Sequence, residues 1–119
     1  MHDIINKYSR LPFEYGLDCC NFAAECVESI TGKNPMESIK YSGEDEALAL
    51  IDSYGSLEAA VRSVLGEPYD GIKDGDITVH DIQDGQQTVG VVYLGRSVVR
   101  TKSGVTDWPL EWAKGIWKT

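Results

Sequence analysis

The spacing of hydrophobic residues changes near Tyr69 and divides the chain into two halves. Before this point, apolar residues recur at steps of three and four, which is typical of helices. After it, short apolar runs stand between turn residues, which is typical of strands. Helices followed by strands predict an α+β domain, in which N-terminal helices pack on a C-terminal antiparallel β-meander.

The first half is expected to form four helices. Gly32 and Gly66 are placed to end the second and the fourth, and Ser42 and Ser56 to cap the third and the fourth. Val64 of the fourth helix is expected to face the core, because it continues the apolar stripe of that helix. The helices are expected over residues 3–9, 18 or 19 to 31, 44–53 and 57–65.

The second half is expected to form strands joined by tight turns. Leu94-Gly95-Arg96 and Lys102-Ser103-Gly104 carry the glycines and polar residues that such turns require. A final helical turn is expected around Leu110 to Lys114. The strands are expected over residues 76–81, 88–93 and 97–101, with a further short strand from residue 105.

Length and charge limit the possible functions. A chain of 119 residues predicts a single domain over residues 1–119. The net charge of −8 opposes the electrostatic attraction on which nucleic-acid binding depends, so nucleic acid is not expected as a partner. The start of the chain lacks the pattern of a signal peptide. No apolar run approaches the roughly 20 residues needed to cross a bilayer, so membrane insertion is not expected.

The three cysteines do not form the pattern of a disulfide framework, because their number is odd and two are adjacent. There is no Cys-x-x-Cys pair, and the only histidines are His2 and His80. We therefore expect no zinc or other metal site and no cofactor.

Cys19 is the candidate nucleophile. It stands at the expected start of the second helix, where free backbone N–H groups and the helix dipole lower the pKa of a thiol. Cys20 lies about 100° round the helix, away from the apolar stripe. The alternative is that Cys19, like Cys26 in the middle of the stripe, is a small core residue. Asp18 has the side chain of a helix cap.

Residues 12–22, PFEYGLDCCNF, resemble the aromatic-Gly-x-Asp-Cys-x-x-Phe opening of the NlpC-like cell-wall cysteine peptidases. Residues 74–77 (DGDI) resemble the Gly-Asp-Ile/Val strand of that family, and residues 88–95 (TVGVVYLG) its His-Val-Gly-Ile strand. The order and separation of these matches fit over roughly residues 11–108. The resemblance implies a small papain-like fold, with Cys19 as the nucleophile and Tyr15 and Asp18 as binding residues.

Phe13 to Pro35 also resembles the opening PFxWGxxDCxxFAAxxVExxTGxxP of small phage and prophage proteins of the same clan. Genes of this subgroup usually lie among siphophage tail genes. The resemblance therefore implies a tail-tip or tail-assembly protein, located in the virion tail or in the host cytoplasm during assembly. Phage tail proteins are its expected partners, with peptidoglycan as a further candidate.

Two positions depart from the pattern of active family members. Thr88 stands where the family has its general-base histidine, and Arg100 stands where a polar residue orients that histidine. Neither side chain can accept a proton at neutral pH. His80, expected on the surface at the end of a strand that pairs with Thr88, is a substitute candidate for the base.

Two functions follow as hypotheses. The first is a structural tail protein that keeps the NlpC-like fold after its catalysis was lost or weakened. The alternative is an active peptidoglycan hydrolase, a cysteine endopeptidase or amidase that uses Cys19. Three tryptophans near the C-terminus, Trp108, Trp112 and Trp117, are expected to pack this segment onto the core or a partner, with a sugar-stacking surface as the other interpretation.

Overall fold

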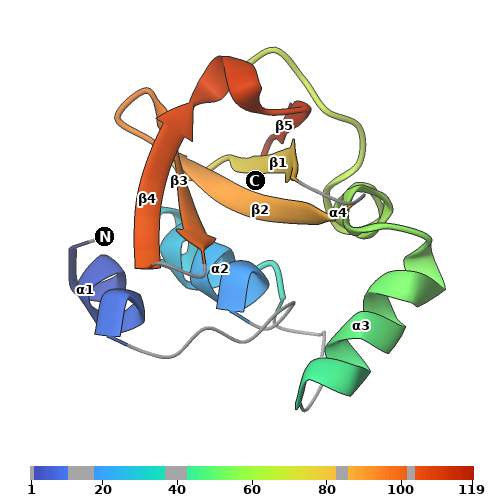
Figure 1. The fold of residues 1–119 in the computed structure, drawn as a ribbon. Helices are drawn as coiled ribbons and strands as arrows, with labels where there is room; N and C mark the ends of the chain where they lie inside the picture. Colours follow the sequence, from blue (N-terminus) through green and yellow to red (C-terminus); the bar gives the residue numbers. More distant parts are fainter. Residues whose placement is uncertain (1, 11–17, 37–42, 83–85, 102–103) are drawn as a thin grey trace.

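The computed structural model describes residues 2–10, 18–36, 43–82, 86–101 and 104–119, with the backbone alone at residues 2, 18, 43–45, 47 and 48. Within these residues, four helices precede five strands, so the predicted α+β class is confirmed (Figure 1). The helices are α1 (His2–Arg10), α2 (Asp18–Thr31), α3 (Gly43–Tyr54) and α4 (Leu57–Leu65). The strands are β1 (Ile77–Asp81), β2 (Gln87–Tyr93), β3 (Arg96–Thr101), β4 (Gly104–Pro109) and β5 (Gly115–Trp117).

Local signals set the ends of the helices as expected. The Ser56 hydroxyl accepts a hydrogen bond from the Ala59 backbone N–H at 3.0 Å and so caps α4. Gly66 ends α4 at φ 88°, and Gly32 follows α2 at φ 84°, where a side chain would be strained. The predicted cap Ser42 lies outside the described residues.

The five strands form one antiparallel sheet in the order β4-β3-β2-β1-β5. The first four are the predicted meander. The expected helical turn is present only as a short 3-10 helix, Leu110–Trp112, and the chain then returns as β5 beside β1. The sequence did not indicate β5, because a three-residue strand is too short to show a period. It is held by Trp117, which pairs with Ile77 and is buried.

Helix α2 packs on one face of this sheet, close to β2 and β3 (Figure 1). The core therefore joins the apolar stripe of α2, which includes Phe22 and Val27, to the inward-facing strand residues Val79 and Val91. All four of these side chains are buried. Burial of apolar side chains between a helix and a sheet is the main source of stability in a domain of this kind.

The prediction that Val64 faces the core is wrong, because 42% of this residue is exposed. It lines an apolar cleft that α4 shares with α2 and α3. Val64 belongs to the apolar stripe of α4, but the part of the stripe that contains it lines this cleft and does not enter the core.

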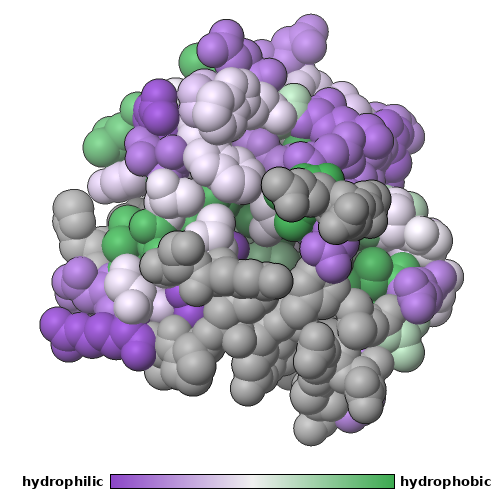
Figure 2. Space-filling model, in the orientation of Figure 1, coloured by the Kyte–Doolittle hydropathy of each residue, from purple (hydrophilic) through white to green (hydrophobic). Residues whose placement is uncertain are grey.

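Charged side chains gather beside α4 and β5. Lys114 lies 3.1 Å from Glu58 and 3.6 Å from Asp81, and Arg62 also pairs with Glu58. Figure 2 shows hydrophilic residues over this part of the molecule. Because the side chains of Arg62 and Lys114 are 39% and 46% exposed, each of these ion pairs is expected to contribute little to stability. No helix in the described part of the chain is long and apolar enough to cross a membrane.

Candidate functional site around Cys19

Cys19 is the second residue of α2 and lies against β2, with 4% of its surface exposed. Pairing between β2 and β3 stops at Gly90 and Val99, so Thr88 and Val89 have no pairing partner on β3. The start of α2 meets β2 at this place, and Cys19 shares the core cluster with Val89. The predicted inward orientation of Cys19 toward the sheet is therefore confirmed.

Hydrogen-bonding groups surround the Cys19 sulfur and lower the pKa of this thiol to about 7. The largest contribution comes from the Cys20 thiol, whose sulfur lies 3.9 Å away. Burial opposes the decrease, while the Val89 backbone N–H and the Thr88 hydroxyl add to it. The Cys20 backbone N–H, at the helix start, adds the least of these. The pKa of Cys19 is lowered, as the sequence predicted, but the Cys20 thiol contributes more to this decrease than the backbone at the helix start does.

Cys20 has the opposite character. Its pKa is raised well above the ordinary range, because its thiol keeps its proton in the hydrogen bond to the Cys19 sulfur and because it is removed from water. The two thiols therefore form a pair in which Cys19 holds the negative charge and Cys20 holds the proton. A thiolate is the reactive form of cysteine, so Cys19 stays the candidate nucleophile of the pair.

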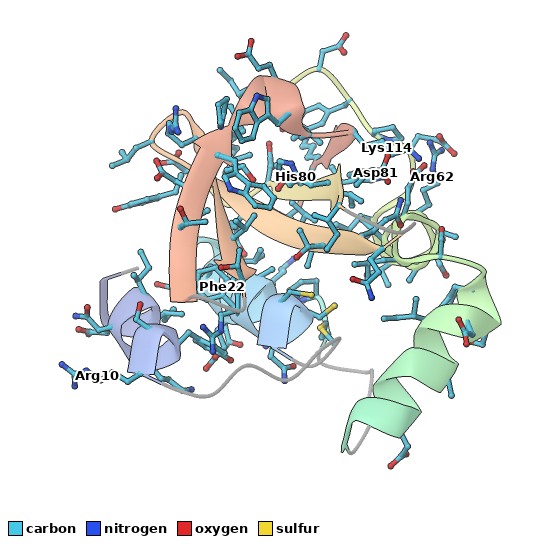
Figure 3. All side chains as sticks on the ribbon, viewed as in Figure 1. Arg10, Phe22, Arg62, His80, Asp81 and Lys114 are labelled. Atoms are coloured by element: carbon cyan, nitrogen blue, oxygen red, sulfur yellow. The ribbon has the colours of Figure 1, made fainter. Side chains whose placement is uncertain are left out.

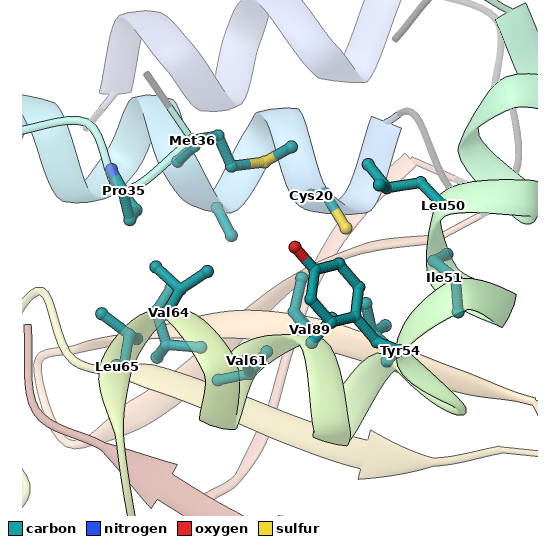
Figure 4. Close-up of a pocket in the computed structure, with 15 residues that line it drawn as sticks. Cys20, Pro35, Met36, Leu50, Ile51, Tyr54, Val61, Val64, Leu65 and Val89 are labelled. Atoms are coloured by element: carbon teal, nitrogen blue, oxygen red, sulfur yellow. The ribbon is translucent and has the colours of Figure 1, made fainter. Parts of the chain in front are cut away.

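Cys20 also lines the apolar cleft between α2, α3 and α4. Figure 4 shows its sulfur directed toward Tyr54 and Leu50, with Met36 and Val64 also among the lining residues. The cleft has a volume of about 100 Å³. The remaining side chains of its wall are Ala23, Ala24, Pro35, Ile51, Leu57, Ala60, Val61, Leu65, Ile77 and Val89.

Thr88 and Arg100, which the resemblance to NlpC-like peptidases predicts to stand at the positions of the general base and its orienting residue, are both buried. A hydrogen bond from the Thr88 side chain contributes to the lowered pKa of Cys19. The Arg100 guanidinium donates a hydrogen bond to the Thr101 carbonyl at 3.3 Å. The Thr88 hydroxyl can stabilise a thiolate but cannot remove or return a proton at neutral pH.

The expectation that His80 lies on the surface is wrong, because only 1% of it is exposed. Its Nε2 atom shares a 2.8 Å hydrogen bond with the Ser97 hydroxyl, and its ring packs edge-on against Trp108. Figure 3 shows His80 across the sheet from Phe22. His80 pairs with Thr88 in the register of β1 and β2, as predicted, but it is not among the groups that act on Cys19.

Burial lowers the pKa of His80, since an imidazolium ion loses solvation in the protein interior. The Trp112 backbone opposes this decrease in part, although Nδ1 has no partner of good hydrogen-bond geometry among the described residues. His80 is therefore neutral at pH 7.

Sequence reasoning missed the buried polar chain that holds His80. The Ser97 hydroxyl bonds both His80 and, at 2.7 Å, Thr78. Gly90 makes room for this chain, because a Cβ atom there would lie 2.8 Å from the hydroxyl oxygens of both Ser97 and Thr78. A glycine inside an apolar strand is the one sequence signal that could have indicated such a close approach.

The other candidate residues are distributed as follows. Cys26 is a core residue, as predicted, and burial raises the pKa of its thiol to about 12. Tyr15 lies outside the described residues, as does the side chain of Asp18, so their predicted binding roles stay predictions. Among the described residues, no cluster of three or more His, Cys, Asp or Glu side chains is arranged to hold a metal ion.

Comparison with known proteins gives a family and no function. Neither the curated proteins nor the solved structures contain a match to this chain. One protein family matches along residues 1–119, and its description is "Domain of unknown function (DUF6950)". Because this match covers the whole chain, the protein belongs to the DUF6950 family.

Proposed function

We propose that the chain is an NlpC-like domain of papain-like fold that serves as a phage tail-tip or tail-assembly protein without efficient peptidase turnover. The resemblance of residues 12–22 and 13–35 to NlpC-like and phage tail-associated proteins supports the family and the setting. The order of helices and strands, with Cys19 at a helix start against the sheet, is compatible with this fold.

The proposed loss of catalysis rests on Thr88, which contributes to the pKa of Cys19 and stands where the resembled peptidases have their base. In a cysteine peptidase, the base beside the thiolate later protonates the leaving amine. Thr88 stands at the position of that base, and its hydroxyl does not transfer a proton at neutral pH. Arg100, at the position of the orienting residue, cannot act as a base either. His80 is held by Ser97, so it does not replace the missing group.

The alternative function, an active peptidoglycan hydrolase using Cys19, is favoured by one observation. The pKa of Cys19 is low enough for a thiolate to form without a base. Such a thiolate could begin an attack on a peptide bond, but expulsion of the amine still requires a proton donor.

Digestion of purified peptidoglycan separates the two functions. We expect no release of peptides by the wild-type protein or by Cys19→Ala. Thr88→His restores the family's base beside Cys19 and is expected to gain activity that Cys19→Ala in the same background removes. Circular dichroism checks that each variant is folded. Release of peptides by the wild type, lost in Cys19→Ala, would establish the hydrolase instead.

Association with tails tests the setting independently. The protein, expressed with the tail proteins encoded beside it, is expected to co-purify with tail complexes or with assembled particles. Cys19→Ala should co-purify equally well, because the structural role does not use the thiol. Absence of the protein from both fractions would contradict the tail assignment.

A further inference from the structure

Cys19 and Cys20 form a chemically asymmetric pair of adjacent thiols. Their sulfur atoms are 3.9 Å apart and share one hydrogen bond. Cys19 lies inward in the core cluster that includes Val89, and the Thr88 hydroxyl and the Val89 N–H help to lower the pKa of its thiol. Cys20 is half-buried and lines the apolar cleft. Cys19 therefore has the lower pKa and is the more nucleophilic thiol, and Cys20 is the protonated thiol beside it.

We propose that this pair is a site of oxidative modification, at which hydrogen peroxide oxidises Cys19 and Cys20 then closes a disulfide with it. The proposal does not depend on the proposed function, because it requires neither a tail partner nor peptidase activity. The cleft is lined by Cys20, whose sulfur lies 3.9 Å from that of Cys19, so a molecule as small as hydrogen peroxide inside the cleft would lie next to the pair (Figure 4).

The reaction has two balanced steps. In the first, the Cys19 thiolate attacks one oxygen of hydrogen peroxide and forms a sulfenic acid, while the other oxygen leaves as hydroxide and takes up a proton to become water. In the second, the Cys20 sulfur attacks the Cys19 sulfur, and the hydroxyl of the sulfenic acid leaves with the Cys20 proton as a second water. Two thiols are oxidised to one disulfide, and one peroxide is reduced to two waters.

The geometry predicts that this disulfide is labile. Adjacent Cα atoms across a trans peptide are about 3.8 Å apart, whereas disulfides usually join Cα atoms about 4.4–6.8 Å apart. Closing the bond therefore strains the peptide between Cys19 and Cys20 and requires the first turn of α2 to change conformation. Strain makes a disulfide easier to reduce. The modification is thus expected to be readily reversible.

Cys26 provides the internal control. It lies seven residues after Cys19 on the same helix, about 10 Å along the axis, which is too far for a disulfide. It is fully buried in the core and its thiol stays protonated. It should therefore neither react with peroxide nor resolve Cys19.

The test treats the folded, reduced protein with hydrogen peroxide at pH 7, then unfolds it and alkylates the remaining thiols. Peptide mapping should show Cys26 alkylated and Cys19 and Cys20 protected. The intact mass, measured before alkylation, should be lower by the mass of two hydrogen atoms. Dithiothreitol should reverse both changes. In Cys20→Ser, Cys19 should accumulate as a sulfenic acid that dimedone traps. In Cys19→Ser, the rate of oxidation should fall at least about fivefold, and Cys26→Ser should match the wild type.

Three results would overturn the proposal. The first is that Cys19 is oxidised no faster in the folded wild type than in the urea-unfolded chain. This result would show that the folded site does not activate the thiol. The second is a disulfide that joins two molecules or includes Cys26. The third is unchanged closure in Cys20→Ser. The comparison of folded with unfolded wild type needs no variant, so it stands even if a substitution disturbs folding.

Discussion

The Thr88 hydroxyl contributes to the lowered pKa of the Cys19 thiol, from the end of β2 that extends beyond its pairing with β3. NlpC-like peptidases, which the sequence resembles, have their catalytic histidine at the position of Thr88. Threonine can keep a hydrogen bond to the thiolate, but it cannot move a proton at neutral pH. The activated Cys19 thiol is used in both proposals. The absence of a histidine at position 88, which matters through the resemblance, is used only in the proposed loss of catalysis.

Removal of the Thr88 hydroxyl should make Cys19 less acidic. In Thr88→Val, the thiolate loses a hydrogen-bond donor, so the pKa of Cys19 should rise and its alkylation by iodoacetamide at pH 7 should slow by about two- to fivefold. The pH dependence of labelling, followed by mass spectrometry at Cys19, measures this. Thr88→Ser retains a hydroxyl and should stay close to wild type. Equal slowing in both variants would show that packing, and not the hydroxyl, sets the acidity.

Burial of neutral His80 should make the protein less stable in acid. The folded-state pKa of His80 is lowered, so its contribution is complete above the unfolded value near 6.5 and is lost as the pH falls below it. Below this value, the loss should be at most about 1.4 kcal/mol per pH unit. Urea unfolding from pH 8 to pH 5 measures this change.

His80→Gln is the matched variant for this measurement. It removes the titrating group while keeping a side chain that can bond Ser97. It should be less stable than wild type at pH 8 but lose less stability between pH 7 and pH 5. Parallel curves for the two proteins would assign the acid sensitivity to other groups.

Gly90 should not tolerate a methyl group. A Cβ atom added at Gly90 would lie 2.6 Å from a methyl carbon of Val99 and 2.8 Å from the Ser97 hydroxyl oxygen. Both distances are shorter than van der Waals contact. Gly90→Ala should cost about 1–3 kcal/mol of unfolding free energy, measured by urea denaturation. Combining it with Val99→Ala removes one clash, so the double variant should be more stable than the sum of the single changes predicts. Additive losses would locate the strain elsewhere.

The terminal tryptophans should differ in their effect on stability. Trp117 is buried and donates a 3.0 Å hydrogen bond from Nε1 to the Gly66 carbonyl, which ties β5 to the end of α4. Trp117→Phe should cost about 1–3 kcal/mol, because it removes both the bond and part of the packed ring. Trp112, which is 61% exposed, is the control, and Trp112→Phe should change stability by less than about 0.5 kcal/mol. Similar thermal midpoints for the two variants would contradict the role given to β5.

Local sequence patterns were sufficient for the order and approximate bounds of the main elements. The three-to-four spacing of apolar residues predicted α2 with Cys19 on its inner face, and Gly66 and Ser56 marked the two ends of α4. These features depend on the backbone preferences of single residues and on the burial of one helix face. Both are determined by residues that are close in the sequence.

Only the tertiary structure decided which distant groups meet. The sequence placed His80 opposite Thr88 in register, but it could not show that the imidazole turns to Ser97 while Thr88 contributes to the pKa of Cys19. It also could not show that Cys20 is the main partner of Cys19, or that β5 closes the sheet. Such contacts depend on the packing of the whole chain. The periodicity of a sequence predicts whether a side chain is buried, but it does not predict which residues that side chain contacts.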